Sequence, residues 1–107
     1  MNFESVKKRF LPMTETAFYV LLCLLEERHG YAIMQEVERL TDGRMSLGAG
    51  TLYGTLGKME KAGLIRTTKE EARRKYYRVT EWGENLIREE ANRLKQLVTH
   101  AEIKEIL

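Results

Sequence analysis

The apolar spacing of this chain changes from helical to strand-like after Gly63 and returns to helical at Thr80. Between these positions, two runs rich in β-branched and aromatic residues, 64–68 and 76–79, flank the charged stretch 69–75. Runs of this kind on either side of a polar segment predict a β-hairpin, and we expect its basic tip to be mobile. Thr80 is a suitable N-cap for a last helix, with acidic residues in the first turn. The chain is therefore expected to place one small hairpin between helices.

Helical spacing accounts for most of the chain before the hairpin. The longest apolar run, 17–25, follows Thr14, which is a plausible N-cap. A helix that is apolar nearly all round is expected at the centre of the fold, covered on most sides. Gly30 is expected to break this helix, and Asp42-Gly43 to close the next one. The helices predicted before the hairpin cover residues 3–10, 16–28, 31–40 and 48–62.

The third strong helix, 48–62, contains glycine at positions that weaken a helix. Gly54 and Gly57 lie in its interior. Each costs roughly 0.5–1 kcal/mol relative to Ala, so together they oppose the helix by up to about 2 kcal/mol. A helix that tolerates this cost is expected to gain from the close approach of another helix or of a ligand.

The last predicted helix carries an apolar seam whose residues recur every four and three positions, as in a coiled coil. Twenty-odd residues at 1.5 Å each give a rod of roughly 35–40 Å, longer than the core of so small a domain covers. We therefore expect this seam to contact a second copy of the chain, with an ordinary core face as the alternative. The expected dimer interface consists of Ile87, Ala91, Leu94, Val98 and Ala101.

Length and composition favour one globular unit. The chain has 107 residues, of which 43% are hydrophobic and 32% charged, as in folded domains. We expect a compact domain over residues 1–80, followed by the dimerisation helix over 81–107. The longest apolar run is far shorter than the about 20 residues that a membrane-spanning helix needs, so no membrane partner is expected. The single cysteine, Cys23, cannot form an internal disulfide, which suits a cytoplasmic protein.

The sequence lacks the spacing of a catalytic or metal site. His29, His100 and Cys23 fall in different predicted elements, without the short spacing that metal ligands show. Cys23 has apolar neighbours, whereas a reactive thiol needs an exposed, electropositive site. Gly48 and Gly50 do not belong to a phosphate-binding unit of strand, loop and helix. We therefore expect no enzyme activity, no metal and no cofactor.

The charges are distributed unevenly along the chain. Residues 1–80 hold 14 basic and 10 acidic side chains, a net charge of +4, whereas residues 81–107 hold 4 and 6, a net charge of −2. Within 66–78 alone, six basic side chains accompany two acidic ones. Such a cluster is either an anion-binding patch or a solvated loop.

The helices 16–28, 31–40 and 48–62, followed by the hairpin, give the element order of the winged helix-turn-helix fold, whose third helix enters the DNA major groove. We therefore expect a mostly α fold with a small β-hairpin, with 48–62 as the recognition helix and 66–78 as the wing. If Leu52 points toward the core, a step of 100° per residue turns one small, polar and basic face outward. That face consists of Thr51, Gly54, Lys58 and Lys61.

Four motifs follow one another along the chain: 29–33 (HGYAI), 50–53 (GTLY), 63–65 (GLI) and 75–80 (KYYRVT). Together they resemble the PadR family of bacterial transcriptional regulators, over about residues 11–85. The resemblance implies a cytoplasmic homodimer that binds double-stranded DNA, usually as a repressor at an inverted-repeat operator. It also implies release by a small-molecule effector, here of unknown identity. The single C-terminal helix is similar to that of the family's smaller subclass.

The candidate DNA contacts come from the recognition helix and the wing. Hydroxyl and ammonium groups on the helix can reach phosphates or base edges, and the wing cations suit phosphates or a narrow minor groove. Tyr53 either contacts a phosphate or only edges the core. Two other functions stay open: a winged-helix module that binds proteins, and a ligand-sensing dimer without a primary DNA role. The candidate DNA contacts are Gly50, Thr51, Tyr53, Gly54, Lys58, Lys61, Arg73, Arg74 and Lys75.

Overall fold

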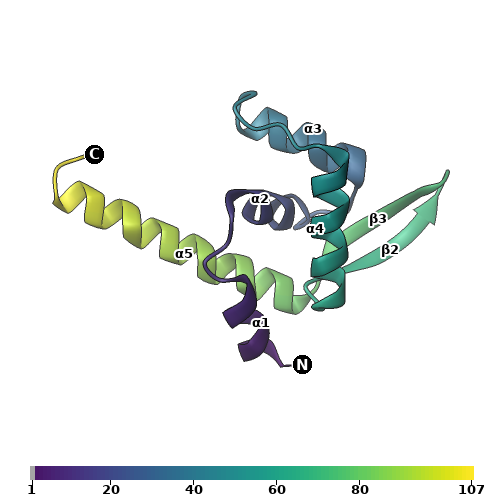
Figure 1. Cartoon of the computed structure of the whole chain (residues 1–107), viewed down its shortest axis with the longest axis horizontal. Coiled ribbons are helices and arrows are strands. Elements are labelled where there is room, and N and C mark those ends of the chain that lie inside the picture. Colours follow the sequence, from purple (N-terminus) through teal and green to yellow (C-terminus); the bar gives the residue numbers. More distant parts are fainter. Residues whose placement is uncertain (1) are drawn as a thin grey trace.

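The computed structural model describes residues 2–107, which form a winged helix followed by one long helix (Figure 1). This part of the chain contains five helices and a three-stranded antiparallel sheet of order β1–β3–β2. The predicted fold, mostly α with a small hairpin, is therefore confirmed, with one strand more than expected. The elements are α1 (Phe3–Phe10), α2 (Glu15–Cys23), β1 (Arg28–His29), α3 (Gly30–Leu40), α4 (Ala49–Lys61), β2 (Ile65–Glu71), β3 (Arg74–Val79) and α5 (Glu81–Ile103).

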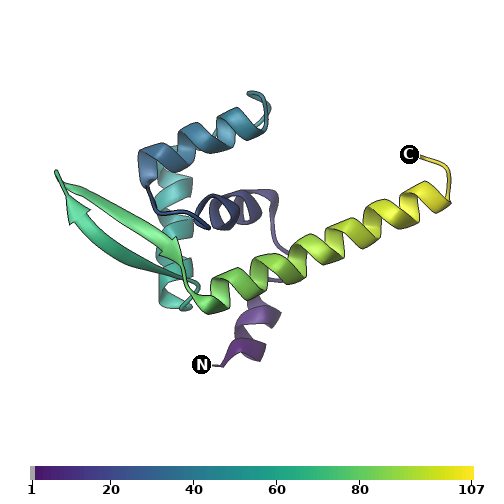
Figure 2. The same cartoon turned by 180° about the vertical axis from the view of Figure 1, so that it is seen from behind.

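The elements extend outward from α2. This helix contacts α3, α4 and α5, so the central position predicted for the apolar helix is confirmed. The hairpin of β2 and β3 projects to one side of the molecule, and the C-terminal half of α5 projects to the other, as both views show (Figures 1 and 2). The protomer is accordingly elongated, with extents of 51 × 36 × 21 Å.

Side-chain caps fix where four of the five described helices begin, among them the two predicted from the sequence. The hydroxyl of Thr14 accepts a hydrogen bond from the backbone N–H of Ala17 (N···O 3.1 Å). In the same way, the hydroxyl of Thr80 accepts from the N–H of Gly83 (N···O 3.2 Å) at the start of α5. Both predicted N-caps are therefore confirmed. The recognition helix α4 differs, since it begins after Gly48 without a side-chain cap.

α2 ends at Cys23, earlier than predicted, because the chain beyond it pairs with the hairpin. The carbonyl of Leu24 accepts a hydrogen bond from the N–H of Val79 (N···O 2.8 Å), and β1 then lies antiparallel to β3. The predicted continuation of the helix to residue 28 is therefore wrong. Gly30, which was expected to break a helix, is instead the first residue of α3.

The strands of the wing are longer than predicted. Apart from a register shift between Thr67 and Lys69, β2 and β3 stay paired up to a turn of two residues, Ala72 and Arg73. Both turn residues have left-handed φ angles, 51° and 65°, as a tight hairpin turn requires. The strands therefore extend into the charged stretch 69–75, which was expected to separate them, while the expected mobility of the tip stays a prediction. Oppositely charged residues such as Glu70 and Lys75 face each other across the strands, which favours continued pairing.

The core lies between the helices and the base of the wing. It includes the apolar stripe of α4, Leu52, Leu56 and Met59. Ile87 of α5 also belongs to this core and is 3% exposed, which leaves almost none of its side chain for a second copy. This corrects the expected dimer seam at its N-terminal end, because the first turns of α5 pack on their own domain. The exposed part of the seam begins at Ala91.

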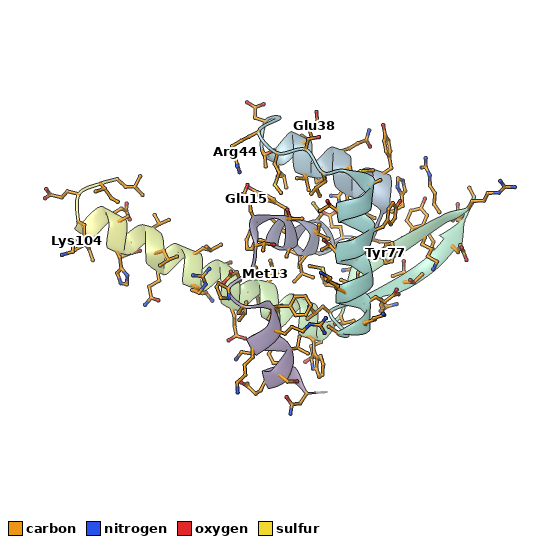
Figure 3. The ribbon with its side chains drawn as sticks, in the orientation of Figure 1. Met13, Glu15, Glu38, Arg44, Tyr77 and Lys104 are labelled. Atoms are coloured by element: carbon orange, nitrogen blue, oxygen red, sulfur yellow. The ribbon has the colours of Figure 1, made fainter. Side chains whose placement is uncertain are left out.

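A buried acid joins α5 to the segment before α2. Glu90 is 1% exposed, and its carboxylate accepts a hydrogen bond from the N–H of Met13 (N···O 2.7 Å). The Arg93 guanidinium donates two more, at N···O distances of 2.6 and 2.9 Å. The bonds from Arg93, helped by the one from Met13, lower the pKa of Glu90 against the opposing effect of burial. Met13 is therefore held beside α5, as Figure 3 shows.

The end of the wing and the start of α5 meet at a tight crossing. The N–H of Thr80 donates to the carbonyl of Leu64 (N···O 2.9 Å), and its hydroxyl donates to the carbonyl of Gly63 (O···O 2.6 Å). Gly83 packs against the same Leu64 carbonyl, so closely that a Cβ at Gly83 would overlap it. The crossing therefore joins the end of α4, the base of the wing and the first turn of α5.

We expect Gly83→Ala to lower the free energy of unfolding by about 1–3 kcal/mol, because the backbone at Leu64 must move to admit the methyl group. Gly57→Ala is the matched control. A Cβ at Gly57 meets nothing within 4 Å, so this change should stabilise α4 by up to about 1 kcal/mol. Urea denaturation at one protein concentration measures both variants. A Gly83→Ala protein as stable as the wild type would contradict the tight crossing.

Candidate nucleic-acid interface

The outward face of α4 is exposed along its length. Its buried stripe points inward, and the opposite side carries no large apolar residue except Tyr53. The exposure of the face predicted from the 100° step is therefore confirmed. The exposed candidate residues on this helix are Gly50, Thr51, Tyr53, Gly54, Lys58 and Lys61.

The glycines of α4 have no packing role in the protomer. A Cβ at Gly50, Gly54 or Gly57 would meet no heavy atom within 4 Å. The close approach that was expected to explain Gly54 and Gly57 is therefore not made by another helix of the described chain. What remains is an exposed surface without side chains at these positions, where an external partner can approach the backbone of α4 closely.

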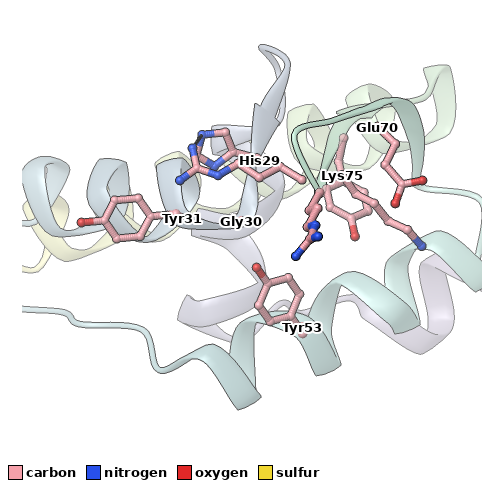
Figure 4. A pocket seen from close by; sticks show the side chains of 9 residues that line it. His29, Gly30, Tyr31, Tyr53, Glu70 and Lys75 are labelled. Carbon is pink, nitrogen blue, oxygen red and sulfur yellow. Dashed lines mark hydrogen bonds between the residues drawn. The ribbon is translucent and has the colours of Figure 1, made fainter.

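The wing adds cations beside this face. Arg73 lies at the turn, Arg74 and Lys75 follow on β3, and all three are exposed. Together with Glu70 and Tyr77 they line one side of a cleft of about 390 Å³, whose other walls are the start of α3 and Tyr53 of α4. Figure 4 shows this cleft, with Lys75 on the wing and Tyr53 rising from α4 toward the start of α3. The structure thus brings the three wing candidates and Tyr53 to one opening, whereas the other helix candidates lie outside it.

Tyr53 owes its position to a glycine. Its ring lies over Gly30, where an added Cβ would lie 2.9 Å from the Cζ atom of Tyr53. The side chain is nevertheless 52% exposed, with its hydroxyl at the cleft. Tyr53 therefore edges the core and presents its hydroxyl to the outside at the same time.

His29 is a residue of this site that the sequence reasoning missed. Its Nδ1 accepts a hydrogen bond from the N–H of Ala32 (3.2 Å), which makes it the N-cap of α3. Its Nε2 lies 3.1 Å from Nη1 of Arg74, and its ring meets that of Tyr76 edge-on with centroids 5.2 Å apart. Partial burial, and then the charge of Arg74, lower the pKa of the imidazole. Reading Gly30 as the start of a helix would have pointed to this cap.

Most cations of α4 and the wing make no ion pair with a carboxylate of the described chain. Within residues 2–107, seven Lys and Arg side chains lie within 4.0 Å of a carboxylate, namely Lys7, Arg28, Arg39, Arg44, Lys69, Arg88 and Arg93. Of these, only Lys69 belongs to the wing, and none belongs to α4. The cations of α4 and the wing that make no such pair are Lys58, Lys61, Arg66, Arg73, Arg74, Lys75 and Arg78. This surface therefore carries positive charge that the described chain does not neutralise.

The free cations continue onto α1. Arg9 and Lys58 line a second cleft of about 300 Å³ between α1 and α4, and no carboxylate of residues 2–107 pairs with either. The guanidinium of Arg9 instead lies 5.5 Å from the ring centroid of Phe10. The positive surface is therefore wider than the recognition helix and the wing.

Other chemistry finds little support in the described residues. Cys23 is buried, and burial raises the pKa of its thiol to about 11. Among residues 2–107, no three His, Cys, Asp or Glu side chains are grouped so that they could bind a metal ion. A separate search of the same residues found no helix that combines the length and hydropathy of a bilayer span.

Comparison with known sequences identifies the same family as the motifs do. Residues 20–89 match the model of the transcriptional regulator PadR-like family. The chain is 33% identical over 91 residues to protein X of Lysinibacillus sphaericus, covering 80% of this chain and 77% of that protein. It is 27% identical over 92 residues to the transcriptional regulator YqjI of Escherichia coli, a match that covers 85% of this chain and 44% of that protein. A 37.1 kDa protein in transposon TN4556 of Streptomyces fradiae is 35% identical over 86 residues, 78% of this chain and 24% of that protein. The chain thus spans less than half of two of these relatives.

Solved structures share the fold. A PadR family transcriptional regulator from Eggerthella lenta has a TM-score of 0.69 at 25% identity, covering 96% of this chain and 88% of that one. A PadR-like transcriptional regulator from Bacillus cereus has a TM-score of 0.71 at 23% identity, covering 86% and 92%. The matched family is one of transcriptional regulators and not of enzymes, as the sequence led us to expect. With its four ordered motifs, its winged helix and this family match, the chain belongs to the PadR-like family of transcriptional regulators.

Proposed function

We propose that this protein is a homodimeric repressor that binds double-stranded DNA in the cytoplasm, at an operator with two inverted half-sites. In this proposal α4 enters the major groove and the wing follows the flanking backbone. The observation that carries it is the set of seven unpaired cations on α4 and the wing. Cations that neutralise phosphates release condensed counterions from the duplex, which favours binding.

The exposed face of α4 suits a reading role within this proposal. Thr51 lies in the first turn of the helix, where its hydroxyl can bond a phosphate or a base edge. Lys58 can reach a guanine edge or a phosphate. At Gly54 the absence of a side chain lets the wall of the groove come close to the helix. This face is polar and basic rather than apolar, which favours DNA over a protein partner.

The first expected result is that the affinity for duplex DNA depends steeply on salt concentration. The logarithm of this affinity should fall linearly with the logarithm of the salt concentration, with a slope of about −0.9 for each phosphate that the protein neutralises. Arg74→Ala should weaken binding to all sequences similarly and make the slope less negative by about 0.9, because it removes one free cation. Fluorescence anisotropy at several salt concentrations measures both quantities.

The control for this experiment is Arg88→Ala. Arg88 lies on α5 and pairs with Glu84 (N···O 2.9 Å), so its removal should leave the slope unchanged. A wild-type protein whose affinity does not respond to salt would contradict DNA binding. A normal affinity and slope for Arg74→Ala would contradict only the wing contact.

Changes on the recognition helix should alter sequence preference instead of general affinity. We expect Thr51→Ala and Lys58→Ala to relax discrimination at one or two base positions, by about 1–3 kcal/mol at each base that loses a direct contact. Selection of bound fragments from a random duplex pool, with wild type and each variant side by side, measures the preference. Arg74→Ala is the matched control, because its preference should stay that of the wild type. Unchanged preferences in both helix variants would contradict direct reading by this face.

The dimer of this proposal is supported by the uncovered half of α5. Leu97 and Val98 are each 50% exposed, and Ile103 is 69% exposed. No other described element covers this half of the helix, which extends to Lys104 at its free end (Figure 3). An apolar stripe of coiled-coil spacing is stabilised when a second copy covers it. The proposed contacts are Ala91, Leu94, Val98 and Ala101, with Leu97 beside them.

We expect Val98→Asp to shift the protein from dimer to monomer, because it places a charge in the apolar seam. DNA affinity should fall with it, since each monomer offers one recognition helix instead of two. Gln96→Asp is the control, because Gln96 lies about 160° around the helix from Val98. Sedimentation velocity at matched concentrations gives the oligomeric state. A Val98→Asp protein that remains dimeric would place the interface elsewhere.

A further inference from the structure

The His29 ring meets an N–H group at each of its two nitrogens. On one side, Nδ1 accepts from the backbone N–H of Ala32 at 3.2 Å. On the other side, Nε2 lies 3.1 Å from Nη1 of Arg74. Both neighbours are donors, because a backbone amide and a guanidinium have only hydrogens to offer.

A neutral imidazole cannot accept two hydrogen bonds, since one of its nitrogens carries the proton. The opposite tautomer could accept from Arg74 at Nε2, but it would leave the N–H of Ala32 without its cap. With Nδ1 kept as the acceptor that caps α3, the proton lies on Nε2. The Nε2–H group of His29 and the guanidinium of Arg74 therefore face each other as two donors without an acceptor. The imidazolium form would not resolve this, because it would lose the cap and add a charge beside Arg74. Partial burial and Arg74 itself lower the pKa of His29 and so favour the neutral ring.

No acceptor of the described chain bonds to either group, although the carboxylate of Glu70 also lines the cleft. Within residues 2–107, the guanidinium of Arg74 makes no ion pair and no other hydrogen bond. The acid opposite it on β2, Glu71, pairs with Lys69 instead. His29 and Arg74 both line the 390 Å³ cleft between the wing, α3 and α4. The volume per molecule of liquid water is about 30 Å³, so this cleft has room for an anion the size of a phosphate.

We propose that His29 and Arg74 together bind one phosphoryl group, with Nε2–H and the guanidinium both donating to its oxygens. The group enters the cleft from outside and supplies the acceptor that the two donors lack. Lys75 on the same wall adds a positive charge. The natural source of the phosphoryl group is a backbone phosphate of duplex DNA, and in this respect the inference rests on the proposed function. His29 thereby both caps α3 and binds the ligand, since the cap bond holds its proton on the side of the cleft.

His29→Asn separates these two roles. Asparagine is a good N-cap, so the unfolding transition should stay near that of the wild type. Its shorter side chain carries no group to the position of Nε2. We expect the affinity for a mixed-sequence duplex to fall about tenfold, as for the loss of a hydrogen bond to a charged group. The salt slope should stay unchanged, because the lost group is neutral, whereas Arg74→Ala makes it less negative by about 0.9.

Two results of this comparison would overturn the inference. One is a duplex affinity of His29→Asn within twofold of the wild type. The other is a slope change in His29→Asn equal to that of Arg74→Ala, because His29 would then only position Arg74. If the wild type itself binds no duplex, the proposed function fails, and the anion site is tested by the following measurement alone.

Nitrogen NMR of the His29 ring tests the site directly. A long-range ¹H–¹⁵N spectrum should show the proton on Nε2 in the free protein, and a proton on Nδ1 would overturn the inference. Titration with a mixed-sequence duplex should shift the Nε2 signal in the wild type but less in Arg74→Ala. Inorganic phosphate is the second probe. A shift with the duplex alone assigns the cleft to backbone phosphate, an equal shift with inorganic phosphate assigns it to free anions, and no shift with either overturns the site.

Discussion

The contact between Gly83 and the carbonyl of Leu64 sets the relative position of the parts that act together in this protein. Leu64 lies in the short connection between α4 and the wing, and Gly83 lies in the first turn of α5. Thr80 secures the crossing with two hydrogen bonds to the backbone at Gly63 and Leu64. A larger residue at position 83 would separate the wing from α5. The angle between recognition helix, wing and long helix thus depends on one residue without a side chain.

The elements with strong local signals could be predicted from the sequence. Thr14 and Thr80 are caps of the expected kind, and the buried stripe of α4 follows from its spacing. The end of α2 could not be predicted, because it depends on a bond between Leu24 and Val79, which are far apart in the chain. The same long-range pairing creates β1. Apolar spacing alone also could not divide the seam of α5, since burial of Ile87 depends on how far the domain core extends along that helix.

The exposed residues of the candidate site could be predicted from the sequence, but the cleft and its hydrogen bonds could not. A rotation of 100° per residue is enough to find the exposed face of α4, and composition is enough to find the cations of the wing. The cleft arises only when the start of α3, the side chain of Tyr53 and the end of β3 come together. His29 illustrates the difference. Its role depends on two neighbours, Ala32 and Arg74, of which one is 45 residues away.

The long helix α5 has two halves that differ in their surroundings. Its first turns are held by the core, by the crossing at Gly83 and by the buried carboxylate of Glu90, while its remaining turns extend away from the domain. Because the base of α5 is held in this way, its first turns belong to the packed domain. In the proposed dimer, a tilt between the two α5 helices would therefore also move the rest of each protomer. A small tilt there would be converted into a larger displacement at the distant wing tip, and so into a change in the span between two bound grooves.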